Sequence, residues 1–113
     1  MKDDEFKKEV SKIQMLEQSF QNTINQRVSA QEQKEEIQSA LESLKKSEEA
    51  YKIIANILVK RNKEELINEL NQKLEKLNSR IDAFKNNENM LKEKISIIRK
   101  NALSHIKNNE SGD

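Results

Sequence analysis

The 113-residue sequence contains no Cys, no Pro and no Trp, and its single Gly is residue 112. The lack of Cys excludes a disulfide framework and a thiol nucleophile. The lack of Pro and of any internal Gly leaves helices uninterrupted until the last residues. Apolar residues are also scarce: they make up 34% of the chain, while charged residues make up 36%. Average globular domains have about 45–50% and about 25%, respectively, so this chain cannot fill an ordinary compact core.

Three further classes of protein are disfavoured by what is missing. A disordered chain is not expected, because good helix formers dominate and the net charge is only +1. No apolar run approaches the roughly 20 residues that span a membrane. Residues 1–5 show no basic-then-apolar signal sequence. We therefore expect a soluble, cytoplasmic protein made of long amphipathic helices that share a narrow apolar seam.

The clearest pattern is a heptad repeat over residues 62–107, the second predicted helical arm. Steps of alternately three and four residues connect twelve positions, of which ten are apolar. Such a strict repeat indicates a coiled-coil seam rather than the wider apolar face of a globular helix. Asn62, with Glu65 three residues later, predicts an N-terminal cap. The seam positions are Ile67, Leu70, Leu74, Leu77, Ile81, Phe84, Glu88, Leu91, Ile95, Ile98, Ala102 and His105.

The first predicted arm, residues 1–48, has a looser pattern. Its apolar residues also lie three or four apart, but two consecutive steps of four, from Phe20 to Ile24 and on to Val28, drift from a pure heptad. A nearly all-polar stretch follows before the apolar spacing resumes. The two arms are similar in length and have opposite charge excesses, and a short connector makes them antiparallel neighbours. We predict residues 108–113 to be a flexible tail.

Between the arms lies an apolar island, residues 51–60, in which β-branched residues and the only Tyr concentrate. Its pattern predicts a β-hairpin with a two-residue turn at Ala55 and Asn56. Asn accepts the positive φ that such turns require, whereas Ala does not favour it. An isolated hairpin is marginal in water, and its unpaired edges favour pairing with other strands. We interpret the island as an element of oligomerisation; the alternative is a loop between helices with a local apolar plug.

No combination of residues with catalytic or metal-binding chemistry stands out in the sequence. The single His, His105, has no companions at metal-ligand spacing, and we predict it to be a seam residue close to solvent. The acidic residues lie on solvated helix faces. We expect no enzyme activity, no metal and no cofactor. Nucleic-acid binding is also disfavoured, because Arg99 and Lys100 form only a minor basic cluster.

Apolar residues beside the seam gather mostly toward the two chain ends. In the predicted antiparallel pair they form a partly splayed apolar tip opposite the hairpin. Flexible Met and aliphatic side chains on such a surface suit promiscuous binding. The alternative, that they only close the last turns of the coiled coil, fits the spacing equally well. These residues are Met15, Met90, Ile97, Leu103 and Ile106.

The island resembles a motif of the β-class subunits of prefoldin. It reads Tyr-Lys-Ile-Ile-Ala-Asn-Ile-Leu-Val-Lys over Tyr51–Lys60, and a polar cap and a strict heptad helix follow it. Members of that class typically have Tyr-Lys, two or three apolar residues, a Gly and then apolar-Leu-Val-Lys; here Ala55 stands where the Gly is usual. The resemblance extends over nearly the whole chain. The short stretch between the arms leaves room for one hairpin, whereas α-class subunits have two.

The resemblance implies a mostly α fold: a long antiparallel two-helix coiled coil with a short β-hairpin at the bend, assembling with partner subunits into a β-barrel platform. It implies a heterohexamer of α-class and β-class subunits, an ATP-independent co-chaperone that captures unfolded proteins and delivers them to a group II chaperonin. No nucleic acid, membrane or cofactor is implied. The expected oligomerisation residues are Tyr51, Ile53, Ile54, Ile57, Leu58 and Val59. The expected client-binding tip residues are Phe6, Val10, Ile13, Ile98, Leu103 and Ile106.

A structural coiled-coil adaptor is the alternative function. In that case the heptad seam binds a helix of another protein, and chains pair through their arms. The two hypotheses differ in the element that makes the intermolecular contact: the hairpin in the first, the arms in the second.

Overall fold

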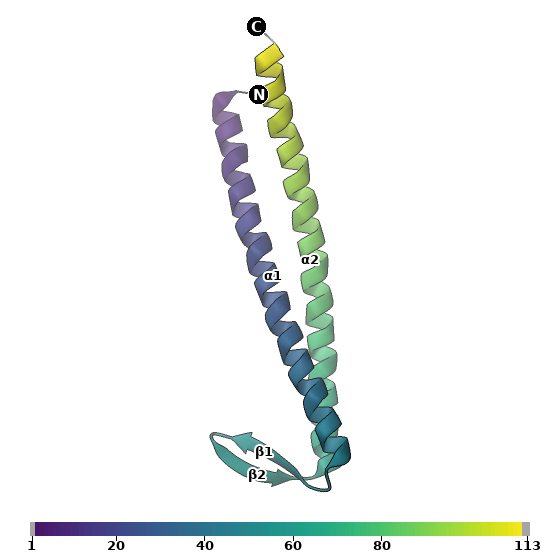
Figure 1. Ribbon diagram of the computed structural model, residues 1–113. Coiled ribbons are helices and arrows are strands. Elements are labelled where there is room, and N and C mark those ends of the chain that lie inside the picture. Colours follow the sequence, from purple (N-terminus) through teal and green to yellow (C-terminus); the bar gives the residue numbers. More distant parts are fainter. Residues whose placement is uncertain (1, 112–113) are drawn as a thin grey trace. The chain divides into compact units, whose positions relative to one another are not determined.

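Two long helices and a short hairpin make up the fold, because helix formers fill both arms and β-branched residues fill the island between them. The computed structural model describes residues 2–111. In chain order the elements are α1 (Asp3–Lys46), β1 (Ala50–Ile54), β2 (Ile57–Arg61) and α2 (Lys63–Ser111) (Figure 1). The predicted fold class, a mostly α pair of helices with one hairpin between them, is confirmed.

The chain folds as two compact units, and both helices contribute to each of them. The hairpin unit comprises residues 27–82, with the end of α1, both strands and the start of α2. The terminal unit comprises residues 1–26 and 83–113 and holds the start of α1 and the end of α2. Within each unit, α1 and α2 lie side by side and run in opposite directions (Figure 1).

Charges and caps mark the helix ends. α1 has acidic residues in its first turn and Lys45 and Lys46 in its last, which is the favourable orientation for the helix dipole. Asn62 caps α2: the Glu65 backbone N–H donates to Asn62 Oδ1 at 3.1 Å, and the Leu66 N–H donates to the Asn62 carbonyl at 3.0 Å. The predicted N-terminal cap is therefore confirmed.

The seam of α2 follows the predicted heptad, since all twelve positions are buried or half-buried. The seam of α1 differs from the prediction. Thr23 and Ala30 are buried, and Arg27 and Lys34 are half-buried. Val28, which the prediction placed on the seam, is instead 42% exposed. These four positions are spaced four, three and four residues apart, so the heptad continues through the middle of α1 without drift. Polar residues can take core positions here because a small hydroxyl, a methyl group or the aliphatic stem of a cation fits between the helices.

The second helix is longer than predicted. It continues to Ser111, whereas we expected a flexible tail from residue 108. Residues 108–111, which include neither Gly nor Pro, extend the helix. The rest of the predicted tail, residues 112–113, lies outside the described residues. Other boundaries move by one or two residues: α1 ends at Lys46, the hairpin spans residues 50–61 and α2 begins at Lys63.

β1 and β2 form an antiparallel hairpin with the predicted two-residue turn. Ile54 pairs with Ile57, and the turn residues Ala55 and Asn56 have φ angles of 48° and 66°. Both angles are positive, as a type I′ turn requires. Asn adopts this conformation readily, but for Ala the left-handed region costs about 1–2 kcal/mol. The turn is thus formed with strain at Ala55.

Each unit has its own narrow core between the helices. The most buried side chains of the hairpin unit are Ala30, Leu41, Ala50, Leu66, Leu77 and Ile81, and those of the terminal unit are Thr23, Leu91, Ile95, Ala102 and His105. Within residues 2–111, neither helix has a stretch that is apolar enough to cross a membrane.

Candidate functional site

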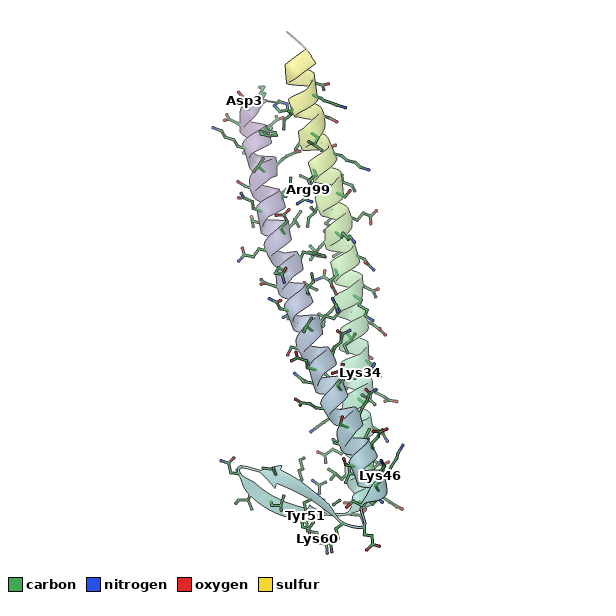
Figure 2. The ribbon with its side chains drawn as sticks, viewed as in Figure 1. Asp3, Lys34, Lys46, Tyr51, Lys60 and Arg99 are labelled. Carbon is green, nitrogen blue, oxygen red and sulfur yellow. The ribbon has the colours of Figure 1, made fainter. Side chains whose placement is uncertain are left out.

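The hairpin has two faces that differ in exposure, because successive residues of a strand point to opposite sides. One face is partly covered at the base of the hairpin: Ala50 is buried, and Lys52, Val59 and Arg61 are half-buried. The other face is exposed and carries Tyr51, Ile53, Leu58 and Lys60. Figure 2 shows Tyr51 and Lys60, which pair in the register, next to each other on neighbouring strands.

Five of the six hairpin residues predicted to oligomerise are exposed, and Val59 is half-buried. Ile53 is the most accessible, at 71%, and Ile57 and Leu58 follow at 64% each. Among the described residues the sheet has only these two strands, so both outer edges keep backbone N–H and C=O groups without strand partners. The hairpin therefore combines a dense apolar surface with directional hydrogen-bonding groups.

A charged clamp, formed by Lys52, Arg61 and Glu69, attaches the base of the hairpin to α2. Glu69 accepts a hydrogen bond from Lys52 Nζ of β1 at 2.6 Å and another from Arg61 Nη2 of β2 at 3.3 Å. The hydrogen bond from Lys52 is the main reason why the pKa of Glu69 lies below its ordinary value. The charges of Lys52, Arg61 and Lys73 lower it further, against the opposing effect of desolvation.

A second carboxylate, Glu49, lies just before β1 and contacts the exposed face. Tyr51 Oη donates a hydrogen bond to Glu49 Oε2 at 2.6 Å, and Lys60 Nζ lies 3.9 Å from Glu49 Oε1. The hydrogen bond and the negative charge of Glu49 raise the pKa of Tyr51 above its ordinary value. The Tyr51 hydroxyl is thus tied to Glu49, and Tyr51 lies beside its strand partner Lys60.

A groove of about 450 Å³ lies between β1 and the adjoining ends of the helices. Its apolar lining comes from Leu44 of α1, Leu66 and Leu70 of α2, and Tyr51 and Ile53 of β1. The groove continues the apolar surface of the hairpin onto both helices, so a partner that covers the strands can also contact the helix ends.

The six residues predicted at the client-binding tips all belong to the terminal unit, where the structure divides them into two groups. Phe6, Val10, Ile13 and Ile98 are half-buried in the seam. Leu103 is 62% exposed and Ile106 is 41% exposed. Three apolar residues beside the seam, Met15, Met90 and Ile97, are also exposed in this unit. The terminal unit thus offers separate apolar side chains rather than one dense patch.

His105 is buried, which corrects the prediction of a seam residue close to solvent. It is only 7% exposed, and its ring stacks on Phe6 with the ring centroids 5.2 Å apart. Its Nε2 atom lies 3.9 Å from Oδ1 of Asp3. The first turns of α1 cover the imidazole, so aromatic stacking replaces the aliphatic contact that is usual at a core position.

A polar pair, the buried Thr23 and the half-buried Asn87, interrupts the apolar seam of the terminal unit. Asn87 Nδ2 donates a hydrogen bond to Thr23 Oγ1 at 3.1 Å, and Thr23 Oγ1 donates one to the Ser19 carbonyl at 2.8 Å. The pair favours the register in which its two members meet, because a slip buries polar groups without partners. The sequence pattern did not predict this pair, because it placed Ile24, the residue next to Thr23, on the seam.

A second groove, of about 580 Å³, lies between α1 and α2 of the terminal unit. Its apolar lining comes from Phe20 of α1 and from Ile95 and Leu103 of α2. Arg99 bridges to Glu17 across the helix pair at this groove (Figure 2). Leu103 was predicted as a tip residue, Phe20 and Ile95 as seam residues, and Arg99 and Lys100 as a minor basic cluster. Their meeting in one groove was not predicted, because the pairing of distant residues is not visible in one helical pattern.

Among the described residues, no group of three or more His, Cys, Asp or Glu side chains is placed to hold a metal ion. Glu69 and Tyr51, whose pKa values are shifted, both take part in the hairpin contacts.

Fold and surface together define a class of protein: paired helices joined by a short hairpin that leaves its apolar face uncovered. Residues 7–109 match the model of the family described as Prefoldin subunit. Because this match covers most of the sequence, the chain belongs to the prefoldin subunit family. Members of this family are non-enzymatic co-chaperones and form hetero-oligomers with one another.

Several proteins similar to this chain are prefoldin β subunits. Prefoldin subunit beta of Archaeoglobus fulgidus is 36% identical over 90 residues, covering 77% of this chain and 78% of the relative. Prefoldin subunit beta of Thermococcus onnurineus is 32% identical over 89 residues, covering 76% and 77%. The crystal structure of the prefoldin beta subunit from Thermococcus strain KS-1 has the same fold, with a TM-score of 0.82 and 23% identity over 89% of this chain and 91% of that chain. The predicted resemblance to the β-class is confirmed.

Proposed function

We propose that this chain is a subunit of a hexameric, prefoldin-like co-chaperone that acts without ATP in the cytoplasm. In this proposal the hairpin joins the hairpins of α-class and other β-class subunits in a β-barrel platform. The terminal units hold unfolded proteins, which then pass to a group II chaperonin. Membranes, nucleic acids and cofactors have no part in the activity.

The exposed hairpin is the observation that carries the proposal. Five exposed Ile, Leu and Tyr side chains lie within eight residues of chain, and the strands have no covering sheet among the described residues. Burying apolar surface contributes about 25 cal/mol per Å². A partner strand would cover these side chains and also pair with the edge groups, which water alone otherwise solvates.

The terminal unit supports the second half of the proposal. Leu103, Ile106, Met15 and Ile97 are exposed on helices that are otherwise strongly charged. Unbranched and aliphatic side chains on separate helix faces adapt to partners of different shape, which suits a surface for non-native proteins.

The adaptor hypothesis has less support. In each unit the seam of one helix is already covered by the other helix, so the seam positions are buried or half-buried within a single chain. A helix from another protein would have to displace this intramolecular contact before it could bind.

Assembly through the hairpin is tested by replacing residues 51–60 with a Gly-Ser linker of the same length and mixing the variant with an α-class subunit. We expect circular dichroism to retain the helical signal and sedimentation to show no hexamer. Val28→Ser, which removes an exposed apolar side chain outside the hairpin, is the matched control and should assemble normally. A hexamer formed by the linker variant would reject the role of the hairpin.

The tip assignment is tested in the assembled hexamer with Leu103→Ser and Ile106→Ser together. Because both side chains are exposed, assembly and thermal stability should be unchanged, while suppression of aggregation of a guanidine-denatured enzyme should weaken. Undiminished suppression would place the client surface elsewhere.

A further inference from the structure

The groove of the terminal unit combines an apolar floor with a one-sided distribution of charge. Phe20 and Ile95 form the floor, and the exposed Leu103 forms one wall. With a volume of about 580 Å³ the groove falls within the range of about 300–1,000 Å³ that is usual for ligand pockets. It can therefore receive one or two apolar side chains of an extended segment.

The rim of the groove is cationic. Lys92, Arg99 and Lys100 all lie on it, and their spacing puts them on the side of α2 that carries Leu103. Glu17 is the carboxylate of the rim, and it is already bridged to Arg99. Neither Lys92 nor Lys100 forms an ion pair with any residue that the structure describes, so the rim has uncompensated positive charge.

We propose that this groove binds apolar side chains of non-native polypeptides that carry a carboxylate beside the apolar residue. An incoming Leu, Ile or Phe covers Leu103 and contacts Phe20, while an adjacent Asp or Glu pairs with Lys92 or Lys100. A basic neighbour would instead meet like charges at short range. The inference rests on the proposed function, because it assigns a chemical class of client to the terminal unit of the assembled co-chaperone.

The test uses three fluorescein-labelled peptides of equal length with the assembled hexamer. Each has two Leu residues in a Gly-Ser background, flanked by Asp in the first peptide, by Lys in the second and by Ser in the third. Fluorescence anisotropy should give the tightest binding for the Asp peptide and the weakest for the Lys peptide. Because exposed ion pairs contribute at most about 1 kcal/mol, we expect about a two- to fivefold preference over the Ser peptide. Raising the salt concentration should erase it.

Two matched double variants locate the effect. Lys92→Glu with Lys100→Glu should reverse the preference toward the Lys peptide, whereas Lys85→Glu with Lys94→Glu makes the same change in net charge outside the groove and should leave the preference intact. Leu103→Ser should weaken the binding of all three peptides. Circular dichroism verifies that each variant remains helical.

The outcomes separate the inference from the proposed function. If both lysine double variants change the peptide preference equally, the preference arises from the overall charge of the protein. That outcome would overturn the assignment of acidic clients to the groove. Equal binding of all three peptides would reject the acidic preference while the holdase role stands. A hexamer that binds no peptide and does not suppress aggregation would overturn the proposed function itself.

Discussion

The hairpin unit and the terminal unit both leave apolar side chains exposed, but in different ways. In the hairpin unit five such residues are concentrated on two short strands with unpaired edges. In the terminal unit they are spread over the flanks of two helices whose backbone hydrogen bonds are already satisfied within the helix. The hairpin can offer a partner both apolar contact area and directional backbone hydrogen bonds, whereas the terminal unit offers apolar contact area alone.

One chain can therefore have one surface that is selective for its binding partner and one that tolerates many partners. Strand pairing fixes direction and register, so it accepts partners with a complementary edge and rejects others. Side chains that protrude from a helix accept any apolar segment that comes near. We therefore expect substitutions in the hairpin to abolish assembly or leave it intact, and substitutions in the terminal unit to weaken client binding gradually.

The largest effect is expected from Ile53→Asp with Leu58→Asp, which places two carboxylates opposite each other on the exposed face. Burying an unpaired charge costs several kcal/mol, so assembly with an α-class subunit should be lost while the helices persist. Native mass spectrometry measures the outcome. Met15→Asp with Ile97→Asp, the equivalent change in the terminal unit, should leave the hexamer intact; if both pairs act alike, the contrast between the units fails.

A smaller effect is expected from Thr23→Ala, which leaves the Asn87 amide without its buried partner. Because Asn87 is half-buried, the loss should be about 0.5–1.5 kcal/mol of unfolding free energy. Hydrogen exchange should show the loss of protection in the terminal unit, with the hairpin unit little changed. Thr23→Val with Asn87→Leu removes both polar groups and should recover most of the stability. A uniform loss across both units would show that they do not unfold separately.

Much of this architecture can be predicted from the sequence, because local rules determine it. The cap at Asn62, the turn at Ala55 and the seam of α2 all depend on residues that are close in the chain. Only the middle of the α1 seam was predicted wrongly, where Val28 was placed on it, because only apolar residues were followed. Thr23 and Arg27 occupy core positions there without being apolar.

Contacts between distant residues could not be predicted. The clamp joins Glu69 to Lys52 and Arg61, and neither spacing is a helical or strand repeat. The groove likewise needs Phe20 from one helix and Leu103 from the other. The charge and polarity of these residues are visible in the sequence, but which of them lie close together depends on how the helices and the hairpin pack.

A modest gain is expected from Ala55→Gly, because Gly adopts the positive φ of 48° without the steric cost that Ala has. The gain should be at most about 1 kcal/mol, since Gly also increases the entropy of the unfolded chain. Slower hydrogen exchange of the hairpin amides would detect it. Ala55→Val should act in the opposite direction, and unchanged exchange in both variants would mean that the turn does not limit hairpin stability.

The smallest effect concerns pH. The folded-state pKa of Glu69 lies below its ordinary value of 4.5, so the clamp stabilises the hairpin unit above that pH. This contribution should decrease as the pH falls through the lowered folded-state pKa. Hydrogen exchange of the β1 and β2 amides, compared at pH values above and below 4.5, measures it. Glu69→Gln should remove this part of the pH dependence, and an identical profile in both proteins would contradict the assignment.

The clamp has a consequence for the cost of association. Because each strand contributes one cation to the same carboxylate, a tilt of the hairpin about its base breaks at least one of the two hydrogen bonds. The clamp therefore restricts the angle between the strands and α2 before a partner arrives. Less orientational entropy is lost on docking, so the clamp should make subunit association modestly more favourable even though it lies outside the exposed face.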